Sequence, residues 1–179
     1  AMLRAETPQE QQALLGVGRR NVIINGGFDV WQRGTSVSLA AGTVYSADRW
    51  TGYSSTTGRT HSQDTTEALS IGFKNCGKFI TGTAGPSFYQ RVEDVRTFAG
   101  QTVTFSFWMK SNSTHTPVWG SLQQVFGSGG SGTVTINLPE LGSVTTDWKH
   151  FTATVTLPSV VGKTIGSNDY LLAYPLVMD

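Results

Sequence analysis

The stretch that decides the fold is Thr102-Val-Thr-Phe-Ser-Phe-Trp-Met109, in which apolar and polar residues alternate. A period of two residues is that of a β-strand with one face toward a core and the other toward solvent. The predicted core face consists of Val103, Phe105, Phe107 and Met109. Trp108 then points to the opposite, outer side of this strand.

The same alternation recurs at several places after Arg20. We expect such strands at residues 69–73, 133–138, 151–157 and 170–178, and a further one in the β-branched run at residues 22–24. Clusters of Gly, Asn, Pro and Ser separate them. Eight to ten short strands, with no convincing helix after residue 20 and no internal repeat, indicate a two-sheet sandwich. The predicted fold class is therefore all-β, and alternation by itself does not choose between sandwich topologies.

Size and composition exclude several classes of protein. A chain of 179 residues suits one domain with a full core. Its net charge of +1 provides no broad electrostatic surface for nucleic acid or an anionic membrane. The sequence contains no run of 18 apolar residues, so it predicts no membrane-spanning helix. The single cysteine, Cys76, excludes an internal disulfide and a multi-cysteine metal site, and we expect it to be a buried, inert thiol.

The first 20 residues predict a short helix rather than a strand. Thr7-Pro8-Gln9-Glu10 has a capping Thr, a Pro at the first helical position and a Glu at the third, and Gly16 ends the pattern. A helix of about two turns is marginal alone in water. Its apolar residues need a second surface, either a copy of the chain in an oligomer or the flank of the same domain. They are Ala13, Leu14, Leu15 and Val17.

Several blocks of sequence carry a family resemblance. The first is Asn21-Val-Ile-Ile-Asn-Gly-Gly-Phe-Asp-Val-Trp-Gln-Arg-Gly-Thr35, followed by Tyr45-Ser-Ala-Asp-Arg-Trp50. Further blocks are residues 90–110, 126–131 and 148–164. In their order and spacing these blocks resemble the C-terminal, carbohydrate-binding-type jelly-roll domains of bacteriophage and prophage tail fibre or head spike proteins.

The resemblance carries implications for fold, assembly and partners. It implies a jelly roll over residues 21–179, preceded in residues 1–20 by a short helix and a linker from an upstream fibre shaft. The first two residues, Ala1-Met2, are typical of a tag remnant. It also implies an extracellular virion surface, a trimeric homo-oligomer, contacts with other fibre or spike proteins, and bacterial surface polysaccharide as the ligand. Neither nucleic acid nor membrane insertion is expected.

No cofactor is required by the resemblance, although it allows a structural calcium ion. Asp29 occupies the position of the acidic ligand in related sugar-binding jelly rolls. The second acidic position departs from the pattern, because the terminal strand offers Asp179 at the very end of the chain instead of an internal Asp.

Aromatic and amide side chains on the outer faces of strands point to sugar binding, because sugars stack on rings and their hydroxyls pair with amides and charged groups. If Gly120, Leu122 and Phe126 face the core, the neighbouring outer positions form a platform. The predicted carbohydrate-binding residues are Trp108, Trp119, Gln123, Tyr53, Tyr89 and Arg91. An exposed tryptophan calls for a reason, and the alternative is that a loop or a partner subunit covers these rings.

Trp31, Trp50 and Trp148 have a different interpretation. Each lies between polar residues at a strand edge, where a ring closes the end of a sandwich, and Asp48 and Arg49 are expected to make local polar contacts beside them.

Catalysis has little support in the sequence. Glu93 and Asp94 are adjacent and would face opposite sides of a strand, which does not suit the paired carboxylates of a glycosidase. Residues 127–132 are rich in glycine but lack the ending of a phosphate-binding loop. The sequence therefore predicts a non-catalytic adhesin. The alternative is a structural or assembly domain of a fibre, and a glycan-cleaving enzyme is the third choice.

Overall fold

The computed structural model describes residues 21–39, 42–54, 58–80, 87–115 and 118–177. The expected helix at residues 7–17, the Ala1-Met2 remnant and Asp179 all lie outside these residues. Within them, eleven strands form three antiparallel sheets. No helix in this part of the chain is long and apolar enough to cross a membrane.

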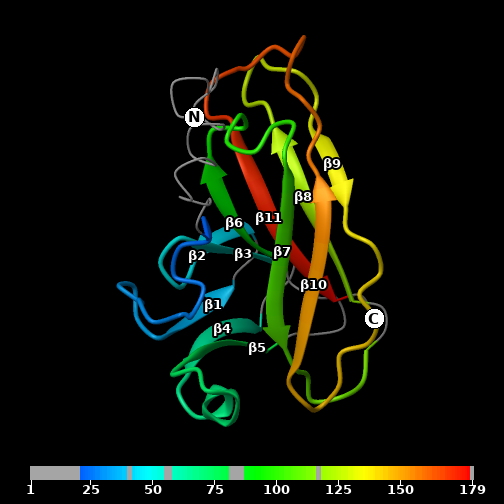
Figure 1. Cartoon of the computed structure of the whole chain (residues 1–179). Helices are drawn as coiled ribbons and strands as arrows, with labels where there is room; N and C mark the ends of the chain where they lie inside the picture. The colour runs from blue at the N-terminus through cyan, green and yellow to red at the C-terminus, as the bar shows by residue number, and fades with distance from the viewer. Residues whose placement is uncertain (1–20, 40–41, 55–57, 81–86, 116–117, 178–179) are drawn as a thin grey trace, which may run out of the picture.

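One layer of the molecule is a six-stranded sheet (Figure 1). Its strand order is β2-β3-β6-β11-β8-β9, so strands distant in sequence become neighbours. The strands are β2 (Gly42–Tyr45), β3 (Trp50–Ser54), β6 (Ser87–Glu93), β11 (Tyr170–Val177), β8 (Val118–Val125) and β9 (Val134–Asn137).

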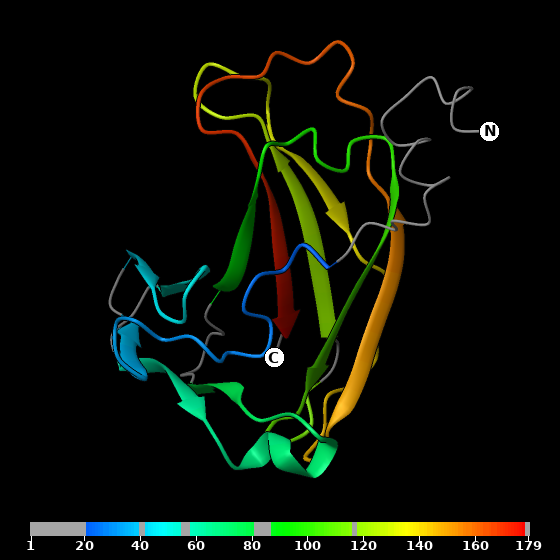
Figure 2. The same ribbon diagram turned by 60° about the vertical axis from the view of Figure 1, so that its left-hand side comes forward.

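The opposite layer consists of two smaller sheets, which lie beside each other across from the six strands (Figure 2). One has the order β1-β4-β5 and the other pairs β10 with β7. These strands are β1 (Ser36–Leu39), β4 (Arg59–Asp64), β5 (Cys76–Ile80), β7 (Thr102–Met109) and β10 (Lys149–Thr156). The arrangement is an antiparallel jelly-roll sandwich, which confirms the predicted fold class.

The main core lies between the β7–β10 pair and the strands β8 and β11. Phe105 and Ala153 from the pair pack against Leu122 and Leu171 from the six-stranded sheet. Along β7 the predicted alternation is confirmed, with buried and half-buried residues at the apolar positions and exposed ones between them. The threonines of β7 and β10 form the outer face, where Thr104 and Thr154 are hydrogen-bonded at 2.9 Å.

A second core, mainly aromatic, lies between β3 and β6 on one side and β4 and β5 on the other. Trp50 stacks on Phe88 with ring centroids 4.5 Å apart, and the fully buried His61 stacks on Phe79 at 4.1 Å. The Nδ1 atom of His61 is 2.6 Å from the hydroxyl of Ser46. Burial among these rings lowers the pKa of His61 to about 3, because the charged imidazolium would lose its hydration.

Two of the expected strands are absent. Residues 22–24 do not form a strand and lead into a turn, where Asn25 and Phe28 have φ values of 55° and 56°. Residues 69–73 were expected to alternate as a strand, but Glu67–Ile71 form a 3-10 helix. The Oδ1 atom of Asp64 accepts hydrogen bonds from the N–H groups of Thr66 (2.9 Å) and Glu67 (3.0 Å) just before this helix.

The hydrogen bond from the backbone N–H of Glu67, followed by the weaker effect of that from Thr66, lowers the pKa of Asp64 to about 2. At the other end of the helix, Gly72 adopts a left-handed conformation with a φ of 83°. Local capping therefore overrides the weak alternation of this segment. Next along the chain, Cys76 is half-buried rather than fully buried, and burial raises the pKa of its thiol.

The glycine-rich loop at residues 127–132 is tied to a second loop. Ser128 pairs with Ser167 in an isolated bridge, and the N–H of Ser131 donates to the carbonyl of Thr164 at 2.8 Å. A Cβ atom at Gly127 would collide with the carbonyl of Ser167 in the second loop. The glycines thus allow two backbones to touch, which is a structural role.

His61 predicts a dependence of stability on pH. Its folded pKa of about 3 lies below the ordinary value of 6.5, so between these values the unfolded chain binds the additional proton. This contribution to stability is complete above pH 6.5. It is lost as the pH falls toward 3, at a limiting slope of about 1.4 kcal/mol per pH unit.

We therefore expect His61→Phe to flatten the dependence of the free energy of unfolding on pH between 7 and 4, whatever it does to stability at pH 7. Urea unfolding of both proteins across this range measures the slopes. Equal slopes for the two proteins would show that the imidazole does not titrate in this way.

Candidate functional site

The alternation of side chains along β6 determines which of its residues lie on the outer face of the six-stranded sheet. Phe88 and Gln90 face the interior and are buried. The side chain of Gln90 is paired with a backbone: its Oε1 atom accepts from the N–H of Ile24 at 2.7 Å and its Nε2 atom donates to the carbonyl of Ile24 at 2.8 Å. Because side chains alternate along a strand, Tyr89 and Arg91 face outward.

Strand pairing extends this outer face across the sheet. The register aligns one row of outward-facing residues, which consists of Tyr45, Thr51, Tyr89, Tyr174, Ser121 and Asn137. Thr51 and Ser121 in this row are buried although they face outward, whereas Tyr45 at the edge is 48% exposed. Short side chains between tall rings make the surface hollow.

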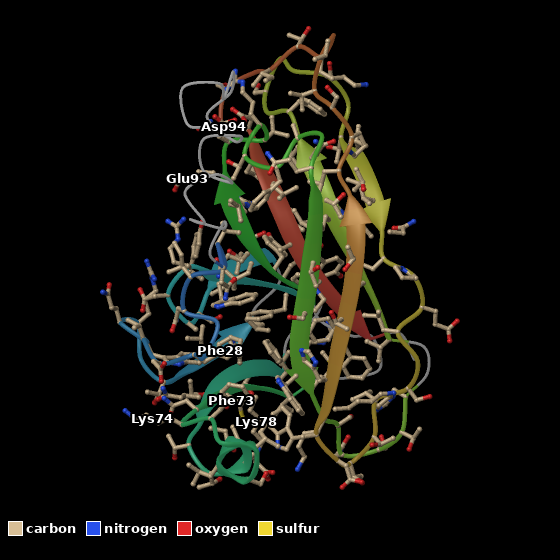
Figure 3. The ribbon with its side chains drawn as sticks, viewed as in Figure 1. Phe28, Phe73, Lys74, Lys78, Glu93 and Asp94 are labelled. Carbon is tan, nitrogen blue, oxygen red and sulfur yellow. The ribbon has the colours of Figure 1, made fainter. Side chains whose placement is uncertain are left out.

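A groove of about 570 Å³ occupies part of this hollow. It crosses β2, β3, β6 and the start of β11, and the loops beside them complete it. Its lining residues are Arg33, Tyr45, Asp48, Arg49, Thr51, Arg91, Glu93, Asn168, Asp169 and Tyr170. Glu93 lies at the end of β6, next to Asp94 (Figure 3).

Two ion pairs lie along the groove. Arg33 is 3.8 Å from Asp48, whose other oxygen accepts the backbone N–H of Gln32 at 2.8 Å. Arg49, in a left-handed conformation with a φ of 71°, places its guanidinium 3.3 Å from the carboxylate of Glu93. Exposed pairs of this kind contribute little to stability. They do set the positions of charged groups around a ligand.

Arg91 is held by aromatic rings. Its guanidinium carbon lies 4.6 Å from the ring centroid of Tyr170 and 5.7 Å from that of Tyr89. Asp169, beside Tyr170, is fixed by the backbone N–H of Val95, which donates to its Oδ1 atom at 2.7 Å. Rings, guanidinium groups and carboxylates therefore meet in one groove.

This set of groups suits a polyhydroxylated ligand. Tyrosine rings offer flat apolar surfaces with a hydroxyl at the rim, and arginine and carboxylate groups supply donors and acceptors. Sites for small ligands in general combine apolar walls with a few placed polar groups.

The structure brings four of the six predicted sugar-binding residues to this one face. They are Tyr53, Tyr89, Arg91 and Gln123, on β3, β6 and β8. Of these, Arg91 lines the groove itself. Trp119 pairs with Leu176 in the register of β8 and β11, and its side chain lies outside the described part of the structure.

Trp108 requires a correction. It is 43% exposed, as its parity predicts, but β7 belongs to the opposite layer. Its ring stacks on His150 at 5.1 Å and lies 6.4 Å from Phe73. Figure 3 shows Phe73 near the lower end of the molecule, far from Glu93. Trp108 and Gln123 do not share one platform, because β7 and β8 expose opposite sides of the sandwich. Sugar binding by Trp108 stays a prediction.

Sequence reasoning missed most of the groove. Asp48 and Arg49 were expected to make local polar contacts, which they do, but not to line a site. Glu93 was considered only as half of an unsuitable catalytic pair. Parity could have placed Tyr45 and Tyr170 outward, but only strand order shows that β2, β6 and β11 lie close together.

The other tryptophans occupy structural positions. Trp50 is buried and donates its indole N–H to the carbonyl of Asn25 at 2.9 Å. Trp31 donates to the carbonyl of Phe28 at 2.8 Å, and Trp148 to that of Glu67 at 2.9 Å.

Asp29, the expected calcium ligand, is engaged by an amide side chain. Its Oδ1 atom accepts a hydrogen bond from Asn75 at 2.5 Å, and the described residues contain no cluster of three or more His, Cys, Asp or Glu side chains that could hold a metal. Asp179 is not among those residues. These observations do not assemble a calcium site around Asp29, and the ion stays a prediction.

Comparisons with known proteins agree with this architecture. No protein family and no curated protein matches the sequence. A xylan-binding domain of carbohydrate-binding module family 22 superposes with a TM-score of 0.51 and 20% identity, over 78% of this chain and 86% of its own. The C-terminal family 22 module of Clostridium thermocellum Xyn10B, whose cleft residues act in ligand binding, gives 0.52 and 20%, over 78% and 87%.

The chain has the jelly-roll fold of carbohydrate-binding modules. A second kind of similarity is weaker: the enzymatically active domain of tailspike protein 4 from bacteriophage CBA120 has a TM-score of 0.47 and 13% identity, over 87% of this chain and 18% of its own. That value is below the level at which we assign a shared fold.

The contrast between Trp50 and Trp108 predicts different effects on stability. Trp50→Ala removes a buried, stacked and hydrogen-bonded ring and should lower the free energy of unfolding by about 3–5 kcal/mol. Trp108→Ala removes a half-exposed ring and should cost much less. Chemical denaturation of both variants measures the difference, and similar large losses would show that Trp108 is part of the core.

Proposed function

We propose that this chain is a non-catalytic glycan-binding domain whose ligand lies in the groove on the outer face of the six-stranded sheet. The observation that carries the proposal is the convergence of Tyr45, Tyr89 and Tyr170 with Arg91 on one hollowed face. The similarity of the fold to that of a xylan-binding domain supports a polysaccharide ligand.

The groove's carboxylates favour binding over cleavage. A glycosidase needs one carboxyl group that donates a proton and a second that acts as base or nucleophile. Asp48 is paired with Arg33, Glu93 with Arg49, and Asp169 accepts a backbone N–H. Each is thus engaged as an acceptor by the protein itself.

The more specific proposal is that the chain is the receptor-binding domain of a phage tail fibre or spike, where it binds bacterial surface polysaccharide outside the host cell. Support comes from the blocks between Asn21 and Thr164 that resemble such domains. The helix predicted at residues 7–17 would connect to a fibre shaft and to sister subunits.

A structural or assembly role is the second candidate, and one observation favours it. Trp108 and Phe73, whose ring centroids are 6.4 Å apart, are exposed on the side of the sandwich opposite the groove, at 43% and 44%. Apolar groups of this size gain free energy when a partner covers them. The two roles are compatible if each uses its own face.

The binding proposal predicts that substitutions on the two faces of the sandwich affect glycan binding differently. Tyr89→Ala and Tyr170→Ala should each weaken glycan binding about tenfold or more, because each removes a ring from the groove or from the support of Arg91, while the melting temperature stays close to that of the wild type. Trp108→Ala, on the opposite layer, is the matched control.

A glycan array followed by calorimetry on the glycans it identifies would measure these effects. Reducing ends should not accumulate during the incubation. If Trp108→Ala alone abolishes binding, the ligand lies on the other face. If reducing ends accumulate and this stops after an Asp or Glu substitution, the domain is an enzyme.

The fibre proposal also predicts a trimer organised by residues 7–17. Three helices that meet on an axis could each bury two leucines, worth roughly 1.5–3 kcal/mol apiece when fully buried. Light scattering should give a trimer for the full chain and a smaller species for a version that begins at Arg19. A monomer for the full chain contradicts the proposal, and a trimer of the shortened chain would place the interface in the jelly roll.

A further inference from the structure

Arg91 is the cation in the groove whose charge the described residues do not balance. It forms no ion pair with any of them, although Arg33 and Arg49 in the same groove each face a carboxylate, at 3.8 Å and 3.3 Å. Asp169, the remaining acidic group of the lining, is directed to the N–H of Val95 at 2.7 Å.

The ring contacts of Arg91 hold its guanidinium group in place without using its hydrogen-bond donors. Its charged carbon lies 4.6 Å from the ring of Tyr170 and 5.7 Å from that of Tyr89. Rings attract a cation through their faces, and this attraction leaves the N–H groups without acceptors. Arg91 therefore has a fixed position and unused donors.

Burial decides which nitrogens of Arg91 a ligand can reach. The Nε atom is buried and has no hydrogen-bond partner in the described part of the chain. Because the protein covers Nε, a ligand would meet the two terminal nitrogens of the guanidinium.

The planar arrangement of these nitrogens matches a carboxylate, which accepts two parallel N–H bonds. Among sugars, uronic and sialic acids combine such a group with hydroxyls and with a C–H face that can lie on tyrosine. We propose that the groove selects an acidic glycan and that Arg91 binds its carboxylate. This inference rests on the proposed function and adds the class of ligand.

Because the net charge of the chain is small, the choice of ligand depends on the charged groups inside the groove. A net charge of +1 attracts all polyanions weakly, so a sulfated or phosphorylated polymer has no general advantage at this surface. The paired acidic groups of the groove, Asp48 and Glu93, would also repel a densely charged chain. One carboxylate per sugar unit, aligned with one guanidinium, fits this distribution of charge.

The test compares acidic polysaccharides with the same polymers after chemical reduction of their carboxyl groups to alcohols. The probes are polygalacturonate, alginate, hyaluronate, polysialic acid and acidic bacterial capsular polysaccharides. Neutral xylan and dextran sulfate serve as references. Affinities for the wild type, Arg91→Gln, Arg91→Lys and Arg96→Gln are measured by calorimetry.

Arg96→Gln is the matched control. Arg96 is exposed, is paired with Asp94 at 3.3 Å just after β6, and does not line the groove. Its loss changes the net charge by the same amount as the loss of Arg91, and it should alter affinity by less than about twofold. Thermal melting of each variant detects any effect on folding.

We expect carboxyl reduction to weaken wild-type binding at least tenfold, and Arg91→Gln to weaken binding of the acidic form equally. The decisive result is non-additivity: for Arg91→Gln, the acidic and reduced forms should bind within about twofold of each other. Arg91→Lys should retain part of the preference, because it keeps the charge and loses the two-point geometry.

Other outcomes overturn the inference in distinguishable ways. If Arg91→Gln weakens both forms equally, its role is structural and the proposed class of ligand is wrong. Binding of xylan or dextran sulfate in preference to every carboxylate polymer also contradicts the inference, while loss of that binding in Tyr170→Ala preserves the proposed function. A wild type that binds no glycan contradicts both proposals.

Discussion

The pairing of the Gln90 side chain with the backbone of Ile24 is the constraint on which the rest of the structure depends. This amide lies on the inner face of β6, where it donates to one backbone group and accepts from the other, and so replaces the pairing that residues 22–24 would have had in a strand. A buried glutamine without such partners would be costly. With them it holds the first described segment against the sheet and fixes which residues of β6 face outward. The groove follows, because Tyr89 and Arg91 can only lie on the other side.

The aromatic core and the groove lie on opposite faces of the same strands, β3 and β6. Trp50 and Phe88 stack beneath the sheet, and their neighbours Thr51 and Tyr89 form part of its outer surface. A rigid packed interior keeps the outer rings in place, and a preorganised site loses less free energy on binding. The neutral His61 contributes to this rigidity, since its ring contacts Phe79 and Phe88 without requiring hydration of a charge. Acidification should therefore disturb the support of the groove as well as the stability of the domain.

The sequence was sufficient for the fold class and for the faces of β7 and β10, because each of these strands has one clearly apolar side. It was not sufficient for β6, where Gln90 inside and Arg91 outside are both polar and the parity stays ambiguous. Residues 67–71 followed the capping side chain of Asp64 rather than their alternation. The groove could not be predicted because it depends on strand order: Tyr45, Glu93 and Tyr170 meet only because β3 and β6 lie between β2 and β11. Periodicity also shows whether Trp108 faces outward but not which layer carries it, and this is why a platform shared with Gln123 was expected.

The distribution of charge has a consequence for how such a groove would work on a fibre. Because the ion pairs at Arg33 and Arg49 are satisfied within the protein and the net charge is small, recognition depends on short-range contacts rather than on attraction from a distance. A shallow groove that contacts a few sugar units through tyrosine rings and one guanidinium supplies modest affinity, since every hydroxyl it binds was already hydrated. Polysaccharides, however, present the same unit many times. An oligomer that displays several grooves toward one surface would convert modest single-site affinity into durable attachment without any new contact, provided that the grooves face the same way. The exposed face around Trp108, on the side of the sandwich away from the groove, is the surface that could contact sister subunits while the groove stays free for the ligand.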